Sequence, residues 1–247
     1  MHPTLRRLDE IAAHLATLDD TIAVLALGSA GAQRGRIDDH SDLNLFLVVA
    51  DGAVGRYTGD ADWLDAVAPV VHTYANDRHG RKALFADGIL VEFAVFTQAT
   101  LRTIPFRGAR VVWQRPDAPR TLTESGVAEP RTPFDTVEFH LNEALVDLLV
   151  GLNRDRRGER LSASRLIQQH AVDRVIALLR LDEGEPPYRD LFDPSRRVER
   201  AYRLPLAAMV PGYDGNAAAA RTILDWLSSR YPVPPALGRA IEDMLSL

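Results

Sequence analysis

Hydrophobic positions divide the first half of the chain into a helix followed by short strands. Apolar side chains recur at helical spacing over residues 5–15, which predicts an amphipathic helix packed on the elements that follow. Residues 21–27 are too uniformly apolar for a strand with one solvated face, so we expect helices against the sheet on both sides. Residues 43–49 form the next apolar run, where the period of two places Asp42 and Asn44 on one side and Leu43 and Leu45 on the other.

Turn residues separate the remaining elements of this half. Asn76, Asp77 and Gly80 mark one turn, and Asp87-Gly88 marks another. Between and around these turns the pattern predicts a helix at 61–67 and strands at 70–74, 81–86, 89–96 and 110–113. Strands joined by short turns predict a meander that ends at residue 96, and the strand at 110–113 closes the sheet.

The second half of the chain has a helical pattern throughout. Periodicity is lost over residues 115–133, where prolines stand at positions 116, 119, 130 and 133, as is typical of a linker or an extended crossing segment. Helical apolar spacing then covers 134–153, 162–181, 216–230 and 235–245, with Pro186-Pro187 and Pro232 between helices. The sequence therefore predicts an α+β protein with a mixed β-sheet and flanking helices at 1–130 and an all-helical bundle at 131–247.

Composition narrows the class of protein. The chain has 247 residues, of which 46% are hydrophobic, enough for a packed core. It contains neither a run of about eighteen apolar residues nor a signal-peptide pattern, so we expect a cytoplasmic protein without a membrane partner. The absence of cysteine excludes disulfides, cysteine-based zinc sites and thiol nucleophiles. A metal site would then use oxygen or imidazole ligands, which favours a hard cation such as magnesium.

The net charge of the chain indicates which class of molecule it binds. The formal net charge of −5 argues against binding long nucleic acid by bulk electrostatics, and a small-molecule substrate is the better expectation. Arginine dominates the basic residues, which we interpret as a genomic composition bias without functional meaning. The apolar faces of the predicted helices are compatible with a homodimer.

Candidate chemistry lies where the first two strands meet. Gly28-Ser29 follows a buried strand and offers a backbone that a phosphate can approach, a hydroxyl donor and free N–H groups. Asp42, about a dozen residues later, can hold a divalent cation that also contacts those phosphates. Glu92 lies in an otherwise apolar strand, and its carboxylate requires a cation or a metal partner.

These residues occur in an order that resembles a known superfamily. Gly28-Ser29, then Ser41-Asp42-Leu43-Asn44, then Val91-Glu92-Phe93 resemble the motifs of the polymerase-beta-like nucleotidyltransferases over about the first hundred residues. The helical half resembles the C-terminal domains of small bacterial nucleotidyltransferases that adenylylate aminoglycosides and lincosamides. This resemblance implies an enzyme of antibiotic resistance that transfers AMP from ATP, or NMP from another NTP, to a hydroxyl of a small molecule.

The resemblance also implies roles for single residues. Gly28 and Ser29 would bind phosphates, Asp42 would bridge two magnesium ions, and Glu92 would serve the nucleophile-side ion or act as general base. The second metal-binding carboxylate of the family falls on Asn44, whose amide oxygen ligates magnesium without a charge.

Three outcomes of that replacement stay open. In the first, the site works with Asn44 as a neutral ligand. In the second, it recruits a carboxylate of the preceding loop, Asp38 or Asp39. In the third, the chain keeps nucleotide binding without transfer, as a regulator or antitoxin-like protein.

Simpler interpretations exist for each residue. Gly28-Ser29 is also a common turn, Ser41-Asp42 also caps a strand start, and Asn44 is also an ordinary polar strand residue. Glu92 is also a candidate for a salt bridge with an arginine of the helical half.

In the predicted bundle, two groups of polar residues share a helix face and are candidates for an acceptor pocket or for a solvated stripe. They are His140, Glu143 and Asp147, and His170, Asp173 and Arg174.

Overall fold

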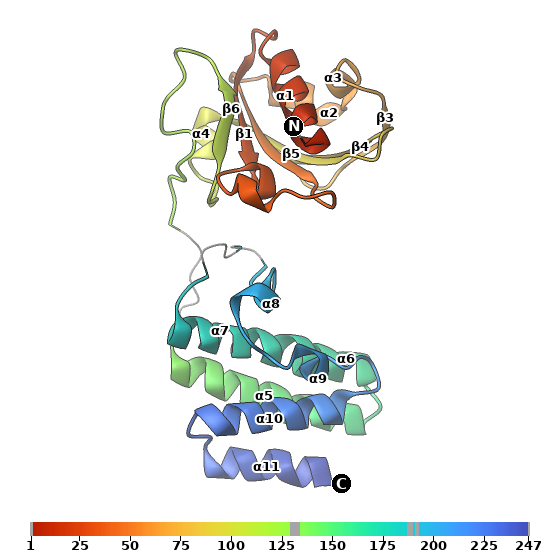
Figure 1. Ribbon diagram of the computed structural model, residues 1–247, viewed down its shortest axis with the longest axis vertical. Helices are drawn as coiled ribbons and strands as arrows, with labels where there is room; N and C mark the ends of the chain where they lie inside the picture. Colours follow the sequence, from red (N-terminus) through yellow and green to blue (C-terminus); the bar gives the residue numbers. More distant parts are fainter. Residues whose placement is uncertain (1, 129–133, 187–189, 191–192, 247) are drawn as a thin grey trace. The chain divides into compact units, whose positions relative to one another are not determined.

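The computed structural model describes residues 2–128, 134–186, 190 and 193–246. It divides the chain into two compact units, Met1–Pro130 and Arg131–Leu247, each with its own hydrophobic core. The first unit contains the sheet and the second contains helices only among its described residues (Figure 1). The predicted boundary between residues 130 and 131 lies outside the described residues.

Six strands form one mixed sheet in the order β3-β4-β5-β2-β1-β6 (Figure 1). The parallel pairing joins β2 to β5, and the other four pairings are antiparallel. The strands are β1 Thr21–Leu27, β2 Leu43–Val49, β3 Val70–Ala75, β4 Gly80–Phe85, β5 Leu90–Thr97 and β6 Arg110–Gln114. Each overlaps a predicted strand, so the predicted mixed sheet is confirmed.

Both faces of the sheet are covered, as the apolar β1 predicts. Helices α1 (Pro3–Leu15), α2 (Val54–Gly59) and α3 (Asp62–Asp65) pack on one face, where Val24 and Ala26 of β1 are buried. On the other face Ile22 and Leu25 pack with α4 (Gln98–Leu101) and with side chains that follow it. Those side chains are Phe106, Ala118 and Leu122.

Two predictions for the first unit need correction. The helix predicted at 61–67 is the single turn α3, and α2 precedes it with only Tyr57 buried, too little for a periodic signal. Of the two alternatives for the segment 115–133, a linker or an extended crossing segment, the free linker is wrong for the described part, because Ala118 and Leu122 pack into the core. Its last residues, 129–133, lie outside the described residues.

The second unit is a helical bundle, as predicted. Its helices are α5 Val137–Arg156, α6 Arg160–Ser164, a π-helical turn Arg165–His170, α7 Ala171–Glu183, α8 Val198–Ala201, α9 Leu206–Met209, α10 Asn216–Arg230 and α11 Pro235–Ser246. Every predicted helix is present, and the short α8 and α9 are additions. Among the described residues, the helices are all too short or too polar to cross a membrane.

Candidate functional site

Strand directions bring the predicted site residues to one edge of the sheet. Because β1 and β2 are antiparallel, the end of β1 lies beside the start of β2, and β5 starts at the same edge because it is parallel to β2. The register pairs Asn44 with Leu27 on one side and with Glu92 on the other. Gly28, Asp42, Asn44 and Glu92, far apart in sequence, therefore gather at the start of β2.

The turn after β1 is conformationally specific. Gly28 has a φ of +57°, in the left-handed region that favours glycine, and a Cβ there would lie 3.7 Å from Nδ2 of Asn44. It opens a single 3-10 turn, Gly28–Ala30, in which Ser29 is buried. Gly31 lies so close to the loop that precedes β6 that a Cβ would be 2.4 Å from the carbonyl oxygen of Gly108. The sheet and this loop thus fix the position of the turn.

Glu92 is paired with a cation from the neighbouring strand. The ammonium of Lys82 lies 3.1 Å from Oε2 of Glu92, and Nδ2 of Asn76 donates to Oε1 at 2.8 Å. Lys82 and Glu92 are directly opposite in the β4–β5 register. Glu92 therefore has a lysine as its ion-pair partner, in place of the arginine of the helical half that was the alternative to a metal, and both carboxylate oxygens accept a hydrogen bond or an ion pair.

Asp42 lies at the same edge without such a partner. Within the described part of the chain its carboxylate makes no hydrogen bond or ion pair. The hydrogen bond and charge of Glu92, with a smaller contribution from Asp42, raise the pKa of Lys82 above its usual value. Lys82 is therefore protonated at neutral pH, and Asp42 offers a free anionic oxygen beside it.

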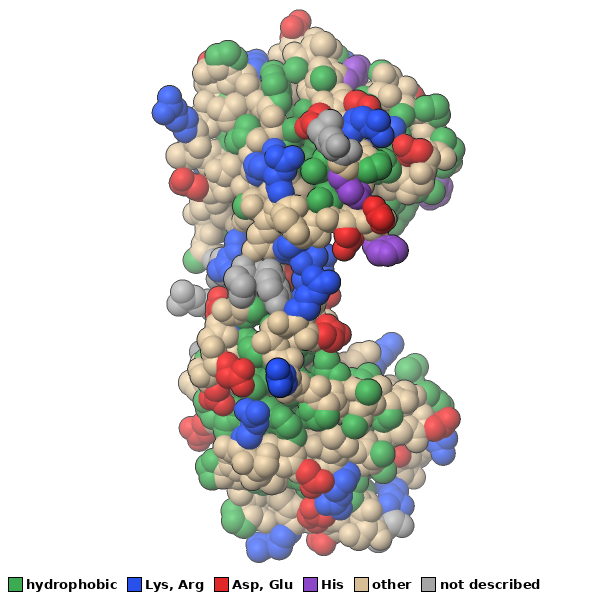
Figure 2. All heavy atoms as spheres, viewed as in Figure 1, with side chains coloured by type: hydrophobic (Ala, Val, Ile, Leu, Met, Phe, Trp, Pro, Cys, Tyr) green, Lys and Arg blue, Asp and Glu red, His purple; other side chains and the backbone are tan. Residues whose placement is uncertain are grey.

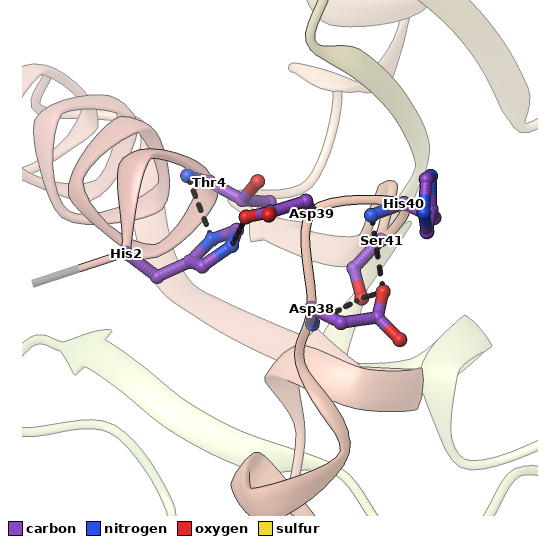
Figure 3. A network of polar contacts seen from close by, with 6 residues as sticks. All are labelled: His2, Thr4, Asp38, Asp39, His40 and Ser41. Carbon is purple, nitrogen blue, oxygen red and sulfur yellow. Dashed lines mark hydrogen bonds and ion pairs between the residues drawn. The ribbon is translucent and has the colours of Figure 1, made fainter.

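The loop before β2 forms its own polar network (Figure 3). The hydroxyl of Ser41 accepts from the backbone N–H of Asp38 at 2.9 Å and donates to Oδ1 of the same residue at 3.0 Å. Asp39 lies 3.2 Å from Nε2 of His2 at the start of α1 (Figure 3). Asp38 and Ser41 thus close the turn, and the contact of Asp39 lies at the chain's first helix.

The donors at the edge fit one magnesium ion better than two. Magnesium is commonly held by one or two carboxylates together with phosphate oxygens, and Asp42 with the amide oxygen of Asn44 supplies such a set. Lys82 and Asn76 each contact one oxygen of Glu92, so a second ion there would share the carboxylate with an ammonium of like charge. No group of three or more acidic or histidine side chains able to hold a metal occurs among the residues that the structure describes.

The candidate residues of the bundle form networks within their own unit. His140 is buried, with Nε2 2.9 Å from Oδ1 of Asp135, and Asp135 also pairs with Arg180. Burial raises the pKa values of Asp147 and Asp173, and the charge of His170 opposes the rise in both. Their role in an acceptor pocket stays a prediction.

Side chains of both charge signs are interspersed on the face of each unit drawn in Figure 2. Such a mixture differs from the single-sign basic stripe that typically follows a nucleic-acid backbone.

Lys82 and Asn76 were missed by the sequence interpretation. One signal is the hairpin itself, but counting outward from Asp87-Gly88 as a two-residue turn puts Phe93 opposite Lys82, one residue away from the Glu92 that it faces in the structure. A second signal lies in composition, because Lys82 is the only lysine among 29 lysine and arginine residues.

Comparisons with known proteins give distant structural neighbours. No family model and no curated protein matches the chain. An aminoglycoside 6-adenyltransferase from Bacillus subtilis is 12% identical, with 100% of this chain and 92% of that chain covered and a TM-score of 0.32. A nucleotidyltransferase-like protein from Exiguobacterium sibiricum is 14% identical, with 98% and 74% covered and a TM-score of 0.33.

A spectinomycin adenyltransferase from Enterococcus faecialis, solved with ATP and spectinomycin, is 12% identical, with 98% and 97% covered and a TM-score of 0.31. By name these neighbours are two adenyltransferases and one nucleotidyltransferase-like protein. At these sequence identities the substrates of the neighbours cannot be assigned to this chain.

Proposed function

We propose that this chain is a nucleotidyltransferase that moves AMP, or another nucleoside monophosphate, from its triphosphate to a hydroxyl of a small molecule. A lincosamide or an aminoglycoside is the acceptor class that we favour. The observation that carries the proposal is the meeting, at the start of β2, of the Gly28 turn, the free carboxylate of Asp42 and the carboxylate of Glu92.

Each of these residues has a place in the proposed reaction. The backbone at Gly28 and the hydroxyl of Ser29 would face the phosphates. The acceptor oxygen would form a bond to the α-phosphorus as the bond to pyrophosphate breaks, and Glu92 is the carboxylate at this edge that would take the hydroxyl proton. A magnesium ion held by Asp42 and Asn44 would supply positive charge to the triphosphate.

A second candidate function is nucleotide binding without transfer, as in a regulator of the same fold. Asn44 favours binding without transfer, because an amide brings no charge to the site. The ion pair with Lys82 favours it as well, because Glu92, the proposed base, is already paired with a cation.

The first experiment is calorimetric titration of the full chain with ATP, with and without magnesium, for the native protein and Asp42→Ala. We expect magnesium-dependent binding that weakens at least about tenfold in the variant, roughly 1.4 kcal/mol. Asp39→Ala is the matched control because it removes a carboxylate of the same loop that lies against His2, and its affinity should be unchanged.

The outcomes separate the two functions. Pyrophosphate release with a panel of aminoglycosides and lincosamides supports transfer, and nucleotide binding without release supports the regulator. Failure of the native protein to bind any nucleoside triphosphate contradicts both.

A further inference from the structure

The charged groups at the start of β2 include one cationic side chain, that of Lys82. Lys82 is the only lysine of the chain, and its ammonium lies 3.1 Å from Glu92 with 31% of its side chain exposed. Among the described residues Glu92 is its one ion-pair partner, which leaves N–H donors of the ammonium for a ligand. The electrostatic influence of Asp42 also reaches it.

A lysine differs from an arginine at this position in a way that matters. Its ammonium is a compact, strongly hydrated point charge, whereas guanidinium is planar and spreads its charge over a fork of donors. In a chain otherwise built with arginine, the one ammonium lies opposite the carboxylate that the resemblance assigns to a metal. A compact cation is the closer chemical substitute for a divalent ion.

We propose that the ammonium of Lys82 takes the place of one of the two divalent cations, so that nucleotide binds here with a single divalent ion. The inference rests on the proposed function, since it concerns the same nucleotide site. The resemblance implies two magnesium ions, whereas the side chains of β2, β4 and β5 provide ligands for one. The inference follows from this disagreement.

Charge balance supports this substitution. Three carboxylates with two divalent ions leave one net positive charge to face the triphosphate. Asp42, Glu92 and Lys82 with one divalent ion leave the same net positive charge, because Asn44 is neutral and Lys82 offsets Glu92. The neutral amide of Asn44 and the ammonium of Lys82 together therefore give a one-ion site the same net charge as a site with three carboxylates and two ions.

Steric and electrostatic considerations point the same way. A second ion bound by Glu92 would have to share its two oxygens with Lys82 and Asn76, which already contact Oε2 and Oε1. It would then lie beside the ammonium of Lys82, where like charges repel. The positive charge of residue 82 thus disfavours a second ion at the native site.

The test counts ions directly. Mn²⁺ bound per protein is measured by electron paramagnetic resonance with a saturating non-hydrolysable ATP analogue, for the native chain, Lys82→Arg and Lys82→Gln. We expect one ion in the native chain and in Lys82→Arg, and two in Lys82→Gln, whose Glu92 is released. Arg120→Gln removes an equal charge from an exposed position and should keep one ion.

A second measurement needs no substitution. Reductive methylation with ¹³C-formaldehyde labels Lys82 and the amino terminus alone and keeps the positive charge. The ¹³C resonance of Lys82 should shift on addition of the nucleotide analogue with one equivalent of magnesium and then stay constant as more magnesium is added.

The failures of the two proposals are distinguishable. Two ions in the native chain, or one ion in Lys82→Gln, overturns the role of Lys82 and leaves the nucleotide site intact. A Lys82 resonance that ignores the nucleotide while calorimetry shows binding overturns it as well. Absence of nucleotide binding in the native chain removes the proposed function and this inference together.

Discussion

Replacing Asn44 with aspartate tests how an added negative charge at the start of β2 changes the stability of the protein. Asn44 lies directly opposite Glu92, and neighbouring strands are about 4.8 Å apart. Two carboxylates roughly 5.5 Å apart repel each other by about 0.8 kcal/mol at the dielectric constant of water and by about 3 kcal/mol at an effective value of 20. Both side chains are half-buried and Lys82 offsets part of the repulsion, so we expect Asn44→Asp to lower the free energy of unfolding by about 1 kcal/mol without divalent ions.

Magnesium should reverse that loss. Asp42, the new aspartate and Glu92 would then supply three carboxylates, and an ion at tenfold its dissociation constant stabilises the folded state by about 1.4 kcal/mol. The assay is urea denaturation in EDTA and in magnesium, followed by the fluorescence of Trp63 and Trp113 in the first unit. Pyrophosphate release by the same variant then shows whether the missing carboxylate limits transfer.

Asn44→Ser is the matched control, since it removes the amide without adding charge and should show no response to magnesium. Equal stabilisation of the native chain and Asn44→Asp by magnesium would refute the reasoning, because the added carboxylate would then be irrelevant to ion binding. An Asn44→Asp variant whose stability does not change with magnesium would refute it as well.

Two further predictions concern the stability of the first unit. Gly31→Ala should lower the free energy of unfolding by more than about 2 kcal/mol because its Cβ meets the Gly108 carbonyl at 2.4 Å, and an effect no larger than that of the exposed Gly35→Ala control, measured by urea denaturation, would contradict this. Burial and the hydrogen bond to Asp20 raise the pKa of Tyr57 to about 12, so the folded state retains a proton that the unfolded state loses near pH 10, and stability should fall between about pH 10 and pH 12. Denaturation across that range should show a smaller fall in Tyr57→Phe, and an identical fall would disprove the assignment.

Elements with a clear apolar pattern were predictable from the sequence. The bounds of β1, β2 and α10 coincide with those predicted, because polar or turn residues bound each of them and apolar side chains run through the strands or recur at helical spacing. Single-turn helices such as α2 and α8 were not predictable, since each buries one side chain and has no period to detect. The packing of Leu122 likewise depends on the finished sheet, which local sequence does not encode.

The residues of the candidate site were predictable from the sequence, whereas the contacts between their side chains were not. Gly28, Asp42, Asn44 and Glu92 stand where strand order alone brings them together. The partner of Glu92 was not inferred, because an ion pair across a hairpin depends on the register and a one-residue slip moves every side chain to the other face.

The strand order divides the site into two halves that different parts of the chain encode. Asp42 and Asn44 belong to the β1–β2 pair, Lys82 and Glu92 belong to the β4–β5 hairpin, and the parallel pairing of β2 with β5 joins them. Each half is built by its own strand pair, and the register of β2 with β5 places Asn44 opposite Glu92 and so couples the charges of the two halves. A tethered ammonium in one half would make the nucleotide site less sensitive to the magnesium concentration of its surroundings.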